Sequence, residues 1–237
     1  MELESARTLA ERFLENQDFV FPQIRTQIEG LRDRPGPGSI SWTIPREQPL
    51  RTIVSPGSYL PSGRGPGVVG TLSFVWEIER VLPRKRRAPA QHFQLIGLAS
   101  TVARVYAVNG AGVPATELAM WRVEIGDDTS PGCHFHVQIR GESNDGPFPR
   151  SLSVPRLPGC LATPMVALEF LLAELFQKRW MTHVSTESDA LKRWRAIQRA
   201  RLSKLFEWQS TTVSDSETLS PWSALKHAKP PPNIFLT

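Results

Sequence analysis

The sequence predicts an α+β fold: a curved antiparallel β-meander of four to five strands, covered on one face by C-terminal helices, plus an N-terminal helix. Three observations lead to this prediction. Apolar residues recur at helical spacing near the start, alternate with polar residues in the middle, and return to helical spacing near residue 163. The connections between the alternating segments carry no helical pattern, so we expect neighbouring strands to run antiparallel.

The N-terminal helical segment is expected over residues 2–31. Apolar residues from Leu3 to Phe13 recur at the spacing of one helix face. Pro22 is expected to open a second, shorter helical piece that ends near Gly30.

The sheet is expected over about residues 39–141. A short apolar piece lies between loops rich in glycine and proline, and four longer segments alternate between apolar and polar side chains. The predicted strands are residues 40–44, 68–82, 92–108, 117–125 and 133–140.

Two helices are expected after the sheet, at about 163–180 and 186–209. Thr163 is a suitable N-cap and Pro164 suits the first helical position. Arg201 falls within the apolar arc of the second helix, so we expect it to meet a carboxylate or to mark an interface.

The domain organisation follows from these elements. Residues 1–209 are expected to form a single α+β domain, because 237 residues suffice for one large core. Residues 210–237 are polar and then rich in proline, which predicts an extended tail.

Composition narrows the classes of function. Lys+Arg 28 against Asp+Glu 23 gives a net charge of +5, a mild excess that favours an anionic partner. Two cysteines exclude a disulfide framework and a cysteine-built zinc site. The N-terminus lacks the apolar core of a signal peptide, and the longest apolar run is interrupted by Glu169 and Glu174. We therefore expect a soluble cytoplasmic protein without a membrane span.

The segment CHFHVQIR, residues 133–140, could carry chemistry. On a strand, His134 and His136 share one face with Gln138 and Arg140, while apolar residues occupy the other. The preceding strand alternates in the same way, so the two strands are expected to pair with matching apolar faces.

One register brings the apolar faces of these two strands together. If Ile125 pairs with Cys133, then Glu124 lies across from the first histidine and Arg122 across from the second. A slip by one residue would place polar side chains in the core, so the parity of this pairing is well specified.

Three interpretations of this polar face remain open. In the first, His134, His136 and Glu124 hold a divalent metal, because two histidines and one carboxylate form a known iron-binding set. In the second, the histidines bind an anion or share acid–base catalysis in a small hydrolase, with Arg122 and Glu124 as catalytic helpers. In the third, this is an ordinary strand surface, either solvated or covered by a helix with its histidines hydrogen-bonded.

Basic residues gather at two further places. A loop carries Arg84, Lys85, Arg86 and Arg87, and the helix after residue 186 carries Lys192, Arg193, Arg195 and Arg199. Such cations either bind phosphate groups or keep the surface soluble.

Our first functional hypothesis is therefore a binding or accessory module for an acidic protein partner or nucleic acid. The second is a small hydrolase or metal-dependent enzyme at the histidine strand. No cofactor is predicted, and a divalent metal is the alternative.

Overall fold

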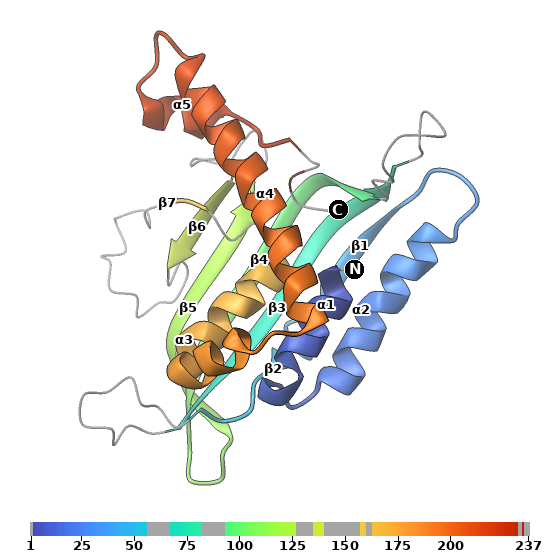
Figure 1. The fold of residues 1–237 in the computed structure, drawn as a ribbon, viewed down its shortest axis with the longest axis vertical. Helices are drawn as coiled ribbons and strands as arrows, with labels where there is room; N and C mark the ends of the chain where they lie inside the picture. Colours follow the sequence, from blue (N-terminus) through green and yellow to red (C-terminus); the bar gives the residue numbers. More distant parts are fainter. Residues whose placement is uncertain are drawn as a thin grey trace.

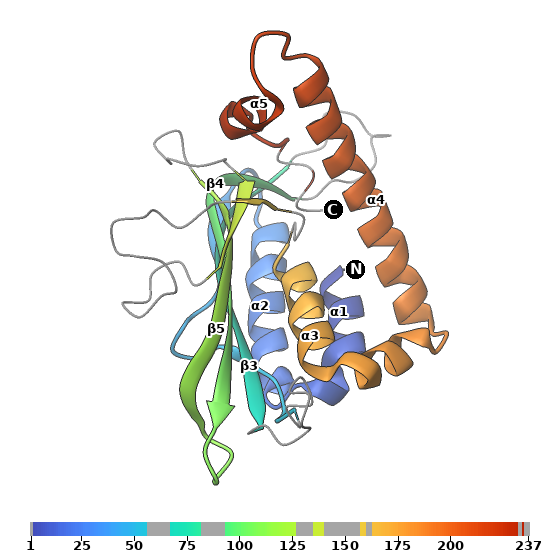
Figure 2. The same ribbon diagram turned by 90° about the vertical axis from the view of Figure 1, so that its left-hand side faces the viewer.

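The structure is a computed structural model that describes residues 2–55, 67–81, 93–126, 135–139, 157–159, 163–231 and 234. It shows the predicted α+β architecture, an antiparallel sheet with helices packed against one face (Figures 1 and 2). The helices are α1 (Glu2–Ala10), α2 (Gln17–Arg32), α3 (Pro164–Ser185), α4 (Asp189–Ser214) and α5 (Pro221–His227), with a short 3-10 turn, η1 (Glu11–Phe13).

The strands follow one another almost in chain order. Neighbours in the sheet are β1-β3-β4-β5-β6-β7, all antiparallel, and β2 continues the edge formed by β1 along β3. This arrangement confirms the predicted meander. The strands are β1 (Ser39–Ile44), β2 (Leu50–Arg51), β3 (Val68–Arg80), β4 (Phe93–Val108), β5 (Pro114–Ile125), β6 (Phe135–Ile139) and β7 (Leu157–Pro158).

Alternation along the strands decides which face the helices cover. Leu72, Phe74 and Trp76 of β3 are almost completely buried and belong to the main core, together with apolar residues of α1, α2 and α3. Figure 2 shows α1, α2 and α3 on the same side of the sheet. Helix α3 approaches β3 closely, because a Cβ added at Gly70 would lie 2.7 Å from a methyl group of Leu175.

Helix α3 begins as the sequence predicts. Thr163 caps it by accepting a hydrogen bond from the Val166 N–H at 3.2 Å, and Pro164 occupies the first turn. The helix continues to Ser185 but is broken at Gln177, whose backbone angles (φ 38°, ψ −112°) are not helical. Its last two turns therefore run in a different direction from its first four.

The segment expected to be an extended tail needs correction. Helix α4 continues to Ser214, and α5 lies within residues 210–237, capped by Ser220. Ser220 followed by Pro221 is a helix-start signal that the high proline content of this segment obscured. Ile234 is only 2% exposed, so this part of the segment packs on the domain.

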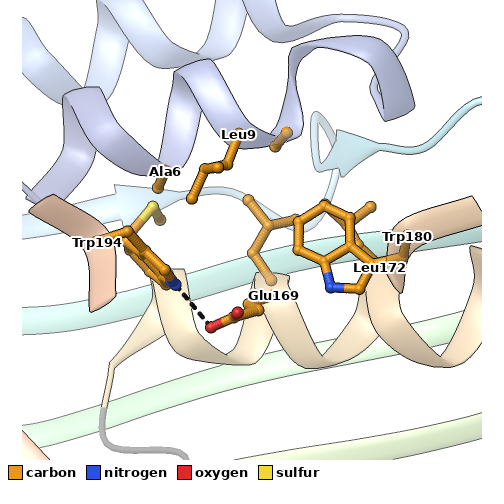
Figure 3. A pocket seen from close by; sticks show the side chains of 9 residues that line it. Ala6, Leu9, Glu169, Leu172, Trp180 and Trp194 are labelled. Atoms are coloured by element: carbon orange, nitrogen blue, oxygen red, sulfur yellow. Dashed lines mark hydrogen bonds between the residues drawn. The ribbon is translucent and has the colours of Figure 1, made fainter. Parts of the chain in front are cut away.

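Helices α1, α3 and α4 enclose a small apolar space of about 10 Å³, roughly the room for one water molecule. Its wall contains one carboxylate, Glu169, which accepts a hydrogen bond from the Trp194 indole N–H at 2.8 Å (Figure 3). Burial raises the pKa of Glu169, and the bond from Trp194 partly offsets this.

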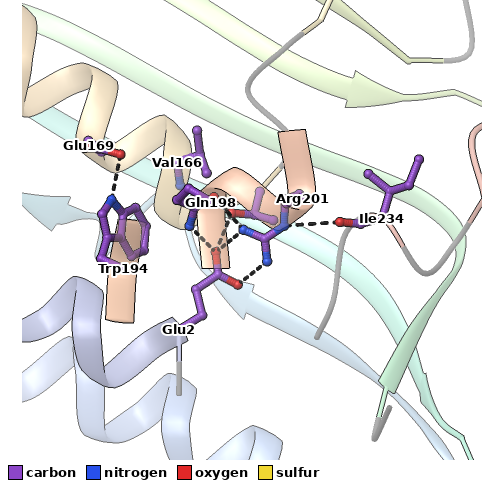
Figure 4. A network of polar contacts seen from close by, with 8 residues as sticks. Glu2, Val166, Glu169, Trp194, Gln198, Arg201 and Ile234 are labelled. Carbon is purple, nitrogen blue, oxygen red and sulfur yellow. Dashed lines mark hydrogen bonds and ion pairs between the residues drawn. The ribbon is translucent and has the colours of Figure 1, made fainter. Parts of the chain in front are cut away.

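Arg201 meets a carboxylate, as the sequence predicts. Its buried guanidinium donates two hydrogen bonds to Glu2, each 2.7 Å long (Figure 4). Gln198 and Thr163 also donate to the Glu2 carboxylate, and Arg201 Nε donates to the carbonyl of Ile234 at 3.1 Å. This network joins α1, the start of α3, α4 and the C-terminal segment.

Candidate functional site

The polar face of β5 and β6 lies on the side of the sheet that faces away from α1, α2 and α3. In the structure Ile125 pairs with Phe135, so Glu124 lies opposite His136 and Arg122 opposite Gln138. The parity is as expected, but the register differs by two residues from the predicted pairing of Ile125 with Cys133. Both registers place apolar side chains on the helix side, so alternation alone could not choose between them.

His136 is in contact with Glu124. Their Nε2 and Oε2 atoms are 3.4 Å apart, and the imidazole side chain is only 2% exposed. Arg122 NH1 and Ser100 Oγ also approach the other carboxylate oxygen, at 3.5 and 3.3 Å. At His136 the polar face is therefore a buried polar cluster and not a solvated surface.

Opposing influences act on the acidity of Glu124. Burial raises its pKa, but the hydrogen bond with His136 and the positive charge of Arg122 lower it more in sum. The pKa of Glu124 therefore lies below its usual range. An ionised carboxylate at this position can orient the imidazole.

The metal interpretation receives no support here. His134 lies outside the described residues, and so do Cys133 and Cys160. Among the residues that are described, no group of three or more histidine, cysteine, aspartate or glutamate side chains could hold a metal ion.

The basic loop, residues 84–87, also lies outside the described residues. The basic helix is α4, and its cations Lys192, Arg193, Arg195 and Arg199 are all exposed. Lys204 is a fifth exposed cation on this helix.

These five cations of α4 share one side of the helix. At about 100° per residue they occupy the half of the circumference opposite the buried residues Leu191, Trp194 and Leu205. The positions between them hold small residues, Ala196, Ala200 and Ser203. No acidic residue occurs on α4 between Asp189 and Glu207. We call the surface formed by Lys192, Arg193, Arg195, Arg199 and Lys204 the α4 basic face.

Two cations of the α4 basic face have local partners. Lys192 lies 3.7 Å from Glu187, and Arg195 donates to the carbonyl of Val184 at 3.0 Å. Within the described part of the chain, Arg193, Arg199 and Lys204 have no acidic side chain within ion-pair distance. Their charge is therefore available to a ligand.

Two pockets contain arginines that the sequence reasoning did not single out. One, of about 460 Å³, lies beside β2 and is lined by Arg46, Arg51 and Arg104, among others. Arg51 and Arg104 already have acidic partners there, Glu15 at 3.0 Å and Glu117 at 3.4 Å. These carboxylates neutralise much of the charge.

The other pocket, of about 380 Å³, lies between η1 and the end of α3. Arg179, Thr182, His183 and Thr186 follow the spacing i, i+3, i+4, i+7 of one helix face. This polar spacing could have indicated the pocket from the sequence alone. It was overlooked because the apolar stripe that precedes it dominates the segment.

Comparison with known proteins gives no further guidance. No family model matches the chain, and neither a curated protein nor a solved structure matches it. None of the helices within the described ranges has the length and apolar character needed to cross a membrane.

Proposed function

We propose that this protein is a binding module for nucleic acid and that the α4 basic face is its contact surface. The observation that carries the proposal is the continuity of this face: five exposed cations with small residues between them and no acid on the same stretch. A solubilising surface usually mixes charges of both signs.

The dimensions of the α4 basic face suit a phosphate backbone. From Lys192 to Lys204 the helix rises by about 18 Å, roughly half of the ~34 Å turn of a DNA duplex. Arginine binds phosphate through two parallel hydrogen bonds, and three of the five cations are arginines. Small side chains between the cations allow close approach of a bulky backbone.

Binding of this kind depends steeply on salt. Each phosphate contact contributes a slope of about −0.9 to the logarithm of the binding constant against the logarithm of salt concentration. We expect Arg193→Gln with Arg199→Gln to reduce the magnitude of the slope by about 2 and to weaken binding at low salt. Fluorescence anisotropy with a labelled 20-base-pair duplex, across a salt series, measures both quantities.

The matched control removes the same charge elsewhere. Arg25 and Arg32 on α2 are exposed cations that already pair with Glu29 and Asp33. Arg25→Gln with Arg32→Gln should leave the slope unchanged. If both double variants lose affinity equally, the effect is one of net charge, and the α4 basic face is not the contact surface. If the protein binds an acidic polypeptide such as polyglutamate but no duplex, the partner is an acidic protein.

A second candidate function is a small hydrolase or metal-dependent enzyme centred on His136. It is supported by the contact of His136 with Glu124, because a carboxylate that orients an imidazole is a common arrangement in acid–base catalysis. The burial of His136 leaves almost no surface through which a substrate could reach the ring. This candidate is tested by metal analysis and hydrolysis assays of the wild type and of the double variant His134→Ala with His136→Ala. It fails if both proteins contain equally little metal and neither hydrolyses phosphodiester or ester substrates.

A further inference from the structure

The pocket between η1 and the end of α3 is lined by hydrogen-bond donors. Arg12 and Phe13 come from η1, and Arg179, Thr182, His183 and Thr186 come from the last turns of α3 and the residue after it. Two guanidinium groups, an imidazole and two hydroxyls therefore surround a volume of about 380 Å³. None of these lining residues is acidic.

The break in α3 determines where these polar side chains lie. Because Gln177 leaves the helical conformation, the turns after it change direction relative to the apolar stripe that packs on the sheet. Arg179, Thr182 and His183 then lie on one face of the final turns. A non-glycine residue with positive φ is costly, and such strain is often found where a site must be positioned.

His183 is held in a fixed orientation. Its Nε2 donates to the carbonyl of Leu9 at 2.9 Å, and its ring centroid lies 5.2 Å from that of Phe13. Because Nε2 donates to Leu9, Nδ1 of the neutral ring is a hydrogen-bond acceptor, and it is the ring nitrogen that can bind a hydroxyl of the ligand. The imidazole thus needs little rearrangement before a ligand binds.

No neighbour in the described part of the chain neutralises the two arginines. The guanidinium carbon of Arg179 lies 5.4 Å from the centre of the Phe13 ring, which positions the group without cancelling its charge. Both Arg12 and Arg179 are exposed, and within the described residues neither has an acidic side chain within ion-pair distance. This distinguishes the pocket from the one beside β2, where two of three arginines are paired.

We infer that this pocket binds a phosphate monoester, with Arg12 and Arg179 contacting its oxygens and Thr182, Thr186 and His183 completing the set of polar contacts. Guanidinium groups and hydroxyls are the side chains that recognise phosphate best. The volume exceeds what a bare ion needs and falls in the range of small-molecule pockets. The inference stands independently of nucleic-acid binding by the α4 basic face.

Inorganic phosphate is the first probe, titrated calorimetrically at constant ionic strength. We expect saturable binding by the intact protein, loss of about tenfold in affinity in Arg12→Gln, and loss of about 100-fold in Arg12→Gln with Arg179→Gln. Arg25→Gln with Arg32→Gln is the matched control, because it removes two exposed cations of α2 outside both proposed sites and should bind phosphate like the wild type. Absence of binding by the intact protein, or equal binding by the two double variants, would overturn the inference.

A second variant covers the possibility that loss of Arg179 disturbs packing on Phe13. Thr182→Val removes one exposed hydroxyl while preserving the side-chain shape, and we expect it to weaken phosphate binding several-fold. Unchanged affinity in this variant, together with unfolding of the double arginine variant, would also count against the pocket.

The source of the phosphate group is resolved by comparing oligonucleotides with and without a 5′-phosphate. Tighter binding of the 5′-phosphorylated strand, abolished by Arg12→Gln with Arg179→Gln, would identify a nucleic-acid end as the ligand. Binding of inorganic phosphate with no preference for the phosphorylated strand would identify a small phosphorylated molecule. If the salt series shows that the α4 basic face does not bind nucleic acid, both of these outcomes can still be interpreted in the same way.

Discussion

Arg201 illustrates how far a single residue can be interpreted from sequence. A cation within an apolar helical arc predicts a buried ion pair, and the structure contains one. The partner, Glu2, lies 199 residues away in the chain and could not be identified, because helical periodicity contains no information about which distant element supplies the carboxylate.

We expect Glu2→Ala to lower the free energy of unfolding by about 3–5 kcal/mol, because it leaves the Arg201 guanidinium buried and without its carboxylate. Glu2→Leu combined with Arg201→Met should cost less than this single change, since no charge is left unpaired. Urea unfolding measures all of these values. The control is Glu29→Ala, which breaks an exposed pair with Arg25 and should change the free energy of unfolding far less than Glu2→Ala. Equal losses for Glu2→Ala and Glu29→Ala would contradict the network.

Glu169 gives a prediction about pH. Burial raises its pKa above the usual 4.5, so the folded protein holds the proton to higher pH than the unfolded chain does. The contribution of Glu169 to stability is therefore full at low pH and is lost as pH rises through the folded pKa. Glu169→Gln removes this dependence while keeping an acceptor for Trp194.

The measurement is the unfolding free energy of Glu169→Gln and wild type in a series of buffers. We expect the wild type to lose stability relative to the variant as pH rises from the usual carboxyl range toward neutrality. Glu174→Gln, which removes an exposed carboxylate from the same helix, is the matched control. If the difference in unfolding free energy between Glu169→Gln and the wild type does not change with pH, the pKa of Glu169 is not raised.

At the scale of elements, the sequence was most informative where two patterns agreed. Thr163 and Pro164 fixed the start of α3 because both reduce the number of unpaired N–H groups in its first turn. The Thr163 side chain accepts from one of these groups, and Pro164 has no N–H to leave unpaired. The pairing of β5 with β6 was predicted in parity but not in register, since a two-residue shift preserves both faces. The break at Gln177 has no sequence signal, because neither glycine nor proline marks it.

The conformation of Gln177 can be tested directly. Glycine tolerates positive φ, so Gln177→Gly should raise the free energy of unfolding by about 1 kcal/mol. In a regular helix the same change is destabilising, and Glu174→Gly, an exposed helical position three residues earlier, should cost about 1 kcal/mol. Thermal and urea unfolding distinguish the two cases. Destabilisation of similar size in both variants would mean that α3 is continuous through Gln177.

At the scale of the whole molecule, local patterns predicted the fold class and the strand order but not the candidate sites. Alternation and helical spacing describe one element at a time, and they sufficed for the meander and its helical cover. Sites depend on which elements meet. The pocket containing Arg12 and His183 requires η1 to lie beside the end of α3, a contact between segments about 170 residues apart. Burial of His136 is also a tertiary property that alternation does not reveal.

The packing of α1 against α3 and α4 has a consequence for synthesis of the chain. Ala6, Leu9 and Ala10 leave the ribosome long before their apolar neighbours Leu172 and Trp194, which lie more than 160 residues later in the chain. During synthesis the apolar side of α1 therefore stays exposed until α3 and α4 have emerged. Chaperones that shield short apolar stretches would be expected to engage it during that interval.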